Sequence, residues 1–380
     1  MKNKTFRAAL LCLLAVCLLL SACSSRSEEA EVAEEPAPTE APIPTENPNP
    51  VVAEVPETTP ATPIPTSEPA VEVPVVDETG KILNPLTGEP MSEDISTLRP
   101  FTVMFNNHTG ALPQCGIGSA DIIYEAPEEG ITRMMGVFSQ LPDCERFGSI
   151  RSTRPYHVDV SLSYDSIFVH WGRSDMAANL IWNTGIDDIE LNEEGNSYAY
   201  RDYSHGSGAT EHTGFIKLEN LKKFLSDNNY RTTHSGEHGY GFAFTDKPEL
   251  NGGTAQKITV YFGGKETTFT YDEAKGGYTM SQYGGTAYVD GDTGEAPVFR
   301  NVLVLRTTIY NETDIASIVL TDTSDVGVLC CDGARGDISW SRGGYSDNFH
   351  YFGADGSDME MGVGKTYVCI VSHNDNVYFE

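Results

Sequence analysis

The pattern of hydrophobic and polar positions divides the chain into four parts. Residues 8–20 form one uninterrupted apolar run, and residues 24–80 contain no aromatic residue. From residue 84 to about 245, strand-like apolar runs alternate with helical stripes, whereas short alternating runs typical of strands follow from residue 255. We therefore predict an α+β fold, with a mixed α/β N-terminal domain at 81–250 and a smaller β-rich C-terminal domain at 254–380.

The N-terminal domain is expected to contain four strands and three helices. Pro155 suits the first position of a helix, because its missing N–H would be unpaired there. Ser174 can cap a second helix through Trp182, and Gly185 can end it. The predicted strands cover 101–105, 120–124, 131–138 and 166–171, and the predicted helices cover 155–164, 174–182 and 218–227.

The second domain shows period-two alternation and no helical stripe. Turns such as Asp290-Gly291-Asp292-Thr293-Gly294 separate its apolar runs. The predicted strands cover 257–262, 267–271, 286–289, 298–305, 315–321, 326–331, 337–341 and 366–371.

The N-terminus has the pattern of a bacterial lipoprotein signal at residues 1–23. Lys2, Lys4 and Arg7 precede the apolar run, which is too short to span a bilayer but has the length of a signal-peptide core. The following Leu20-Ser21-Ala22-Cys23 resembles the bacterial lipobox. We expect Cys23 to carry diacylglycerol and palmitate-type acyl chains, which would place the protein on the extracytoplasmic face of the cell membrane. The alternative is an ordinary secretory signal with an incidental cysteine.

Residues 24–80 are predicted to be a disordered stalk. They hold 12 of the 21 prolines and 13 acidic residues against a single basic one, Arg26. Such a segment cannot bury enough surface to offset its ordering entropy, and it would act as a semi-rigid spacer.

Charge and cysteine content exclude several classes of protein. Residues 81–380 carry 21 basic and 42 acidic groups, which argues against a nucleic-acid partner and against a body lying on anionic lipid. Five cysteines remain after Cys23, and their spacing predicts neither a zinc site nor a disulfide framework. Pairing of Cys115 with Cys144 stays open. We expect no metal and no cofactor.

An ordered series of motifs resembles the YerB family of Gram-positive lipoproteins. The resemblance is dense over residues 84–225 and looser over the β-rich part. The motifs are Asn84-Pro85-Leu86-Thr87-Gly88, Val103-Met104-Phe105-Asn106-Asn107, Ala120-Asp121-Ile122-Ile123-Tyr124-Glu125, Gly148-Ser149-Ile150-Arg151-Ser152-Thr153-Arg154-Pro155-Tyr156, Val169-His170, Arg201-Asp202 and Gly364-Lys365-Thr366.

The resemblance implies two parts, a mixed α/β N-terminal one and a smaller β-rich C-terminal one, and it implies no established reaction. The sequence departs from the family pattern at Glu211-His212-Thr213, where Pro-His-Asn is usual, and at Cys115 and Cys144.

The densest polar cluster in the sequence predicts an anion site. Arg151 and Arg154 lie at a strand-to-helix junction, and a guanidinium pair beside unpaired helix N–H groups suits a carboxylate or phosphate. The alternative is an internal salt-bridge network that pairs these arginines with Glu125 and Glu129. The candidate cluster comprises Glu125, Glu128, Glu129, Arg133, Arg151 and Arg154.

Four further residues are candidates for binding or catalysis. His170 ends a predicted strand before a helix, where open α/β sheets place their sites, although a lone histidine is more often a packed side chain. Arg201, Asp202 and His212 belong to a Gly/Ser-rich loop. His212 with Asp202 and a serine would imitate a hydrolase triad, but no nucleophile motif accompanies them.

These observations favour a non-enzymatic envelope protein. It would recognise a peptidoglycan fragment or a wall-enzyme partner through the arginine-bearing cleft. The alternative is a wall-acting enzyme that uses His170 or His212 with Glu125 or Asp202. A third possibility is an interaction role carried by the β-rich domain.

Overall fold

The computed structural model describes residues 80–234, 240–312 and 315–380. The predicted signal peptide, Cys23 and the predicted stalk up to residue 79 lie outside the described residues. No helix in the described part is long and apolar enough to cross a membrane.

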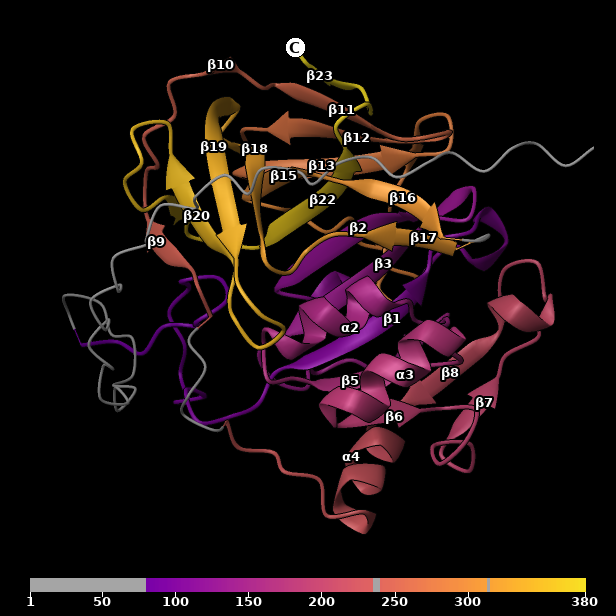
Figure 1. The fold of residues 1–380 in the computed structure, drawn as a ribbon. Coiled ribbons are helices and arrows are strands. Elements are labelled where there is room, and N and C mark those ends of the chain that lie inside the picture. The colour runs from indigo at the N-terminus through magenta and orange to yellow at the C-terminus, as the bar shows by residue number, and fades with distance from the viewer. Residues whose placement is uncertain (1–79, 235–239, 313–314) are drawn as a thin grey trace, which may run out of the picture. The chain divides into compact units, whose positions relative to one another are not determined.

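A mixed sheet of eleven strands dominates the structure (Figure 1). Its strands come from both halves of the chain, and β2 pairs in parallel with β22 across more than 240 residues of sequence. In spatial order the strands are β10 (Gly253–Thr254), β19 (Ala334–Arg342), β18 (Thr323–Cys331), β15 (Asn301–Thr307), β22 (Thr366–Ser372), β2 (Ile122–Glu128), β3 (Ile131–Phe138), β1 (Phe101–Asn106), β5 (Ile167–His170) and β6 (Asp188–Glu190), with β20 (His350–Gly353) pairing with β19.

Smaller sheets accompany this large one. A five-stranded antiparallel sheet contains β14 (Thr286–Ala287), β13 (Gly277–Gln282), β12 (Lys265–Asp272), β11 (Lys257–Phe262) and β23 (Val377–Phe379). The others are a three-stranded sheet of β4 (Arg146–Gly148), β8 (Gly214–Lys217) and β7 (Ala199–Arg201), and two pairs, β16 (Ile309–Glu312) with β17 (Ile315–Ile318) and β21 (Glu360–Gly362) with β9 (Ala243–Thr245).

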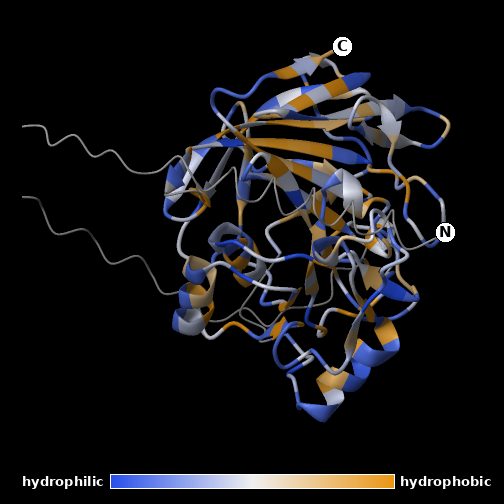
Figure 2. Ribbon diagram, turned by 90° about the vertical axis from the view of Figure 1, so that its right-hand side faces the viewer, coloured by the Kyte–Doolittle hydropathy of each residue, from blue (hydrophilic) through white to orange (hydrophobic). Residues whose placement is uncertain are grey.

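The three predicted helices are confirmed. α2 (Pro155–Leu162) begins with the proline. α3 (Asp175–Thr184) is capped by Ser174, whose hydroxyl accepts from the Ala177 amide at 3.2 Å, and it ends at Gly185 in the left-handed region. α4 (Leu218–Asp227) buries its predicted apolar stripe. Hydrophobic and hydrophilic residues alternate along this helix, which lies at the bottom of Figure 2.

The expected fold class is wrong. The described residues contain these three short helices among many strands, so the first half is not a helix-rich α/β domain. Sequence periodicity locates helices, but it missed short strands such as β4, β6, β7 and β8, which are too short to show an alternating pattern. The strands of the first half also join those of the second half in one sheet, and single-strand patterns carry no information about partners.

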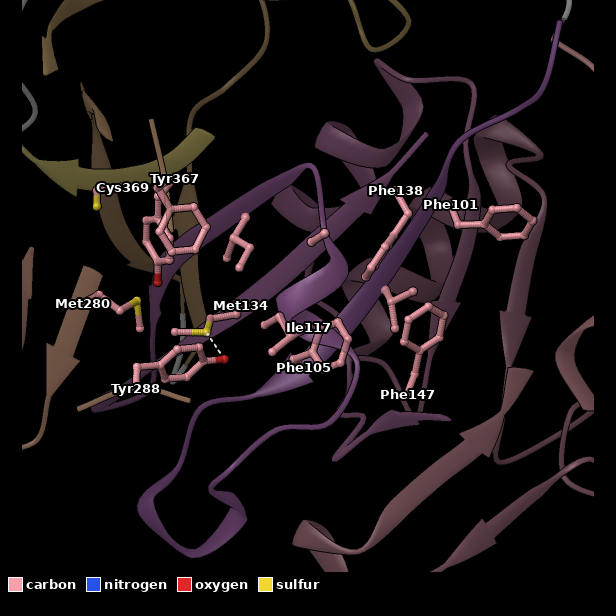
Figure 3. Close-up of a cluster of buried hydrophobic side chains, with 14 of the residues drawn as sticks. Phe101, Phe105, Ile117, Met134, Phe138, Phe147, Met280, Tyr288, Tyr367 and Cys369 are labelled. Atoms are coloured by element: carbon pink, nitrogen blue, oxygen red, sulfur yellow. Dashed lines mark hydrogen bonds between the residues drawn. The ribbon is translucent and has the colours of Figure 1, made fainter. Parts of the chain in front are cut away.

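The core lies on both faces of the large sheet. Successive residues of a strand point to opposite faces, so Val103 and Phe105 belong to one buried cluster and Met104 to the other. The cluster on the first face includes residues of α4 and of the five-stranded sheet, and in Figure 3 Met134 packs beside Tyr288. The cluster on the second face includes residues of α2 and α3, which lie in front of the sheet in Figure 1.

Candidate functional site

The carboxyl ends of β1, β5 and β6 form one edge of the sheet. β1 pairs in parallel with β5, and β5 pairs in parallel with β6, so Asn106, His170 and Glu190 end neighbouring strands. Ser149 accepts a backbone hydrogen bond from Asn106 at 2.9 Å, and Arg151 accepts one from Trp171 at 3.1 Å. The segment before α2 therefore crosses this edge, which is where the sequence predicted a site.

Arg154, one member of the predicted guanidinium pair, is already paired with carboxylates of the chain itself. Arg154 makes a bidentate ion pair with Glu129, with Nε–Oε1 at 3.0 Å and Nη2–Oε2 at 2.8 Å. It also contacts Glu128 at 2.5 Å, and Arg133 pairs with the same buried carboxylate. Arg154 and Arg133 thus belong to an internal salt-bridge network.

Glu125 lies outside that network. Its buried carboxylate contacts the ammonium of Lys265 from β12 and accepts hydrogen bonds from Tyr367 at 2.8 Å and Thr267 at 2.9 Å. Thr132 donates a further hydrogen bond at 2.6 Å. Glu125 is therefore a structural link between the two halves of the chain. The sequence could not predict Lys265 as its partner, because the two residues are 140 positions apart.

Arg151 differs from the other arginines of the cluster. It is half-buried, and its side chain makes no hydrogen bond or ion pair with the described residues. Its charge acts on His212, whose pKa is lowered by burial, by the neighbouring His108 and by Arg151. The exposed Glu211 is also within reach of this charge.

His212, the histidine on which Arg151 acts, forms a stacked pair with His108. Their ring centroids lie 4.6 Å apart at an interplanar angle of 12°. His212 Nδ1 is 2.9 Å from the side-chain amide nitrogen of Asn106, which fixes the ring at the end of β1. Sequence reasoning missed His108, although its position directly after β1 could have marked it.

His170 is completely buried between two carboxylates. Its Nε2 is 3.0 Å from Asp188 Oδ2, and its Nδ1 is 3.4 Å from Glu190 Oε2 and 3.1 Å from the Gly172 carbonyl. Burial alone would lower the pKa of His170, but the hydrogen bonds to Asp188 and Glu190 outweigh burial and raise the pKa to about 9. His170 is therefore protonated at neutral pH and cannot accept a proton as a general base.

The loop residues do not assemble a triad in the described structure. Asp202 pairs with Arg146 at 3.0 Å and accepts from the Ser204 hydroxyl at 2.5 Å, whereas His212 bonds to Asn106. Arg201 lies over the Trp171 ring at 4.4 Å from its centroid. Arg201 and Asp202 thus hold the loop in place.

The candidate residues form no metal site in the described part of the chain, and they do not line the cavity at the start of β1. In the described ranges, no group of three or more His, Cys, Asp or Glu side chains is arranged to hold a metal ion. A cavity of about 600 Å³ lies at the opposite end of β1, lined in part by Leu98, Phe101, Leu225 and Tyr230. It contains none of the predicted site residues.

Sequence comparison finds two adjoining family matches. Residues 86–231 match the "Protein of unknown function (DUF3048) N-terminal domain", and residues 258–368 match the corresponding C-terminal domain. The candidate lipoprotein YerB of Bacillus subtilis (strain 168) is 30% identical over 239 residues, which cover 61% of this chain and 69% of the relative.

Structural comparison gives the same result. The crystal structure of YerB from Bacillus subtilis superposes with a TM-score of 0.69 at 25% sequence identity, covering 78% of this chain and all of that one. The resemblance that the motifs indicated is confirmed: this chain belongs to the YerB family, with both its N-terminal and its C-terminal domain.

Proposed function

We propose that this protein is a lipid-anchored accessory protein of the cell envelope that binds an anionic group of a peptidoglycan fragment or of a wall-enzyme partner. The lipobox-like sequence ending at Cys23 and the homology to a candidate lipoprotein support the anchor. The proline-rich acidic segment that follows would carry the body away from the lipid surface.

The unpaired side chain of Arg151 is the observation that carries the binding proposal. A half-buried guanidinium gains most from a carboxylate that it can bind with two parallel hydrogen bonds. Arg133 and Arg154 already have carboxylate partners, whereas Arg151 has none among the described residues and lowers the pKa of His212, which stacks on His108. We therefore narrow the predicted cluster to Arg151, His108 and His212 at the ends of β1 and β5.

The enzymatic alternative has less support. His170 is held as a cation by two carboxylates, and Asp202 and His212 have separate partners. Carboxylates lie against both ring nitrogens of His170, so neither nitrogen is free to take a proton from a substrate, and His212 bonds to Asn106 instead of to a carboxylate.

Equilibrium binding tests the proposal. The full-length chain in detergent micelles is titrated with muropeptides that carry free carboxylates and with the same muropeptides after amidation. We expect binding of the free acids alone and a loss of about tenfold or more in Arg151→Gln, since charged hydrogen bonds contribute roughly 1.5–3 kcal/mol. Arg335→Gln removes the same charge from β19 and serves as the matched control.

Two results would contradict the proposal in different ways. Unchanged affinity in Arg151→Gln would remove the site assignment but leave a binding function. Digestion of isolated peptidoglycan by the wild type, abolished in His212→Ala, would replace the binding function with an enzymatic one.

A further inference from the structure

An exposed tryptophan marks a second surface, whose lining does not include Arg151. Trp182 lies near the end of α3 and is 87% exposed. Tryptophan side chains bury more apolar surface than most others and are seldom left this open in a folded chain. The exposed ring is therefore available for contact with another molecule.

A small hollow of about 250 Å³ lies beside the indole. Ala178 and Ile181 of α3 contribute its apolar lining, and Asp188, Glu193 and Glu194 contribute carboxylates from β6 and the loop after it. This volume is below that of typical drug-sized pockets, so the hollow suits one side chain rather than a large ligand.

The charge of the hollow is negative. Arg173 contributes a guanidinium to the described lining, but that guanidinium already pairs with Glu193 at 2.8 Å and with the buried Glu190 at 3.2 Å. The buried His170 lies 3.0 Å from Asp188 and offsets part of its charge. Glu194 has no ion pair with the described residues, although its Oε1 accepts from the Glu190 amide at 2.7 Å.

We propose that this hollow binds a lysine side chain presented by a partner polypeptide. The ammonium would lie against the face of Trp182, within about 6 Å of the ring centroid, and near the carboxylates of Asp188 and Glu194. Its alkyl stem would cover Ala178 and Ile181, as lysine stems do on apolar surfaces. The excess of acidic over basic groups in residues 81–380 would raise the local concentration of a basic segment and speed its encounter.

Fluorine NMR of the full-length chain labelled with 5-fluorotryptophan gives a direct test. The chain has three tryptophans, Trp171, Trp182 and Trp340, and the spectrum of Trp182→Phe assigns the relevant signal. Titration uses a short capped peptide with one central lysine and an identical peptide with norleucine, which keeps the alkyl stem but lacks the charge. We expect a saturable shift of the Trp182 signal with the lysine peptide, at an affinity about tenfold above that of the norleucine peptide, and no shift of the other two signals.

A variant of the charged wall makes the test specific. Glu194→Gln keeps the oxygen that accepts from the Glu190 amide but removes the charge, so it should weaken lysine-peptide binding at least about threefold without unfolding α3. Glu360→Gln, on β21, is the matched control for an exposed glutamate. Equal shifts with both peptides, or an unchanged affinity in Glu194→Gln, would overturn the proposal.

Discussion

Replacing His170 with glutamine tests the electrostatic arrangement at the carboxyl edge of the sheet. Both ring nitrogens of His170 face acceptor oxygens, with Asp188 on one side and Glu190 and the Gly172 carbonyl on the other. A neutral imidazole has a single N–H, so only the protonated ring can donate on both sides. Folding therefore favours the cation.

The contribution of protonated His170 to the stability of the fold follows from its distances to the two carboxylates and from its raised pKa. At an effective dielectric constant of about 20, ion contacts at 3.0 Å and 3.4 Å each contribute about 5 kcal/mol, against which the cost of burying three charges must be set. The net result is a pKa raised from 6.5 to about 9, which corresponds to roughly 3 kcal/mol. Because the folded-state pKa lies above the unfolded one, this stability is fully present below pH 6.5 and is lost as the pH rises through 9.

Urea unfolding followed by tryptophan fluorescence between pH 6 and 10 measures this loss. We expect the wild type to lose roughly 3 kcal/mol more than His170→Gln across this range. The variant should also be less stable at pH 6, since it leaves buried carboxylates without their cation. His350→Gln, at an exposed position, should keep the wild-type slope. Identical pH slopes in wild type and His170→Gln would refute the assignment of a buried imidazolium.

Two further predictions concern the interior. Lys265→Met should lower the free energy of unfolding by roughly 3–5 kcal/mol in urea titrations, because it leaves the buried Glu125 carboxylate without its cation. The double variant with Glu125→Gln should recover part of this loss, and equal stabilities of the single and double variants would contradict the pairing. Cys115 and Cys144 are free thiols whose pKa values burial raises to about 12, so both should resist iodoacetamide at pH 8 and react after unfolding. Rapid labelling of the folded chain would show that they are accessible.

The local elements were largely predictable because their signals are local. Pro155, the Ser174 cap and Gly185 fix helix ends through the backbone itself, and the stripe from Leu218 to Leu225 fixes the buried face of α4. The position of His170 at a strand end was predictable for the same reason. Its role was not, because Asp188 and Glu190 reach it only through the parallel pairing of β5 with β6.

The spacing of residues in the sequence could not show which charged side chains of the candidate site pair with one another. The sequence offered three arginines and three glutamates in one cluster, and only the folded structure separates them. Glu128 pairs with Arg133 and Arg154, and Glu129 pairs with Arg154. Glu125 pairs with Lys265, whereas Arg151 has no carboxylate partner among the described residues and acts on the pKa of His212.

The sequence by itself determined the motif series of the family and most of the regular elements, because each depends on residues close together in the chain; for the same reason it predicts a lipobox-like signal and an acidic spacer. The tertiary structure decided which strands pair and which charges meet. The pairing of β2 with β22 and the ion pair of Glu125 with Lys265 each join residues more than a hundred positions apart. Such contacts arise when both segments pack into a common core, and the hydrophobic pattern of one segment does not show which other segment it will meet.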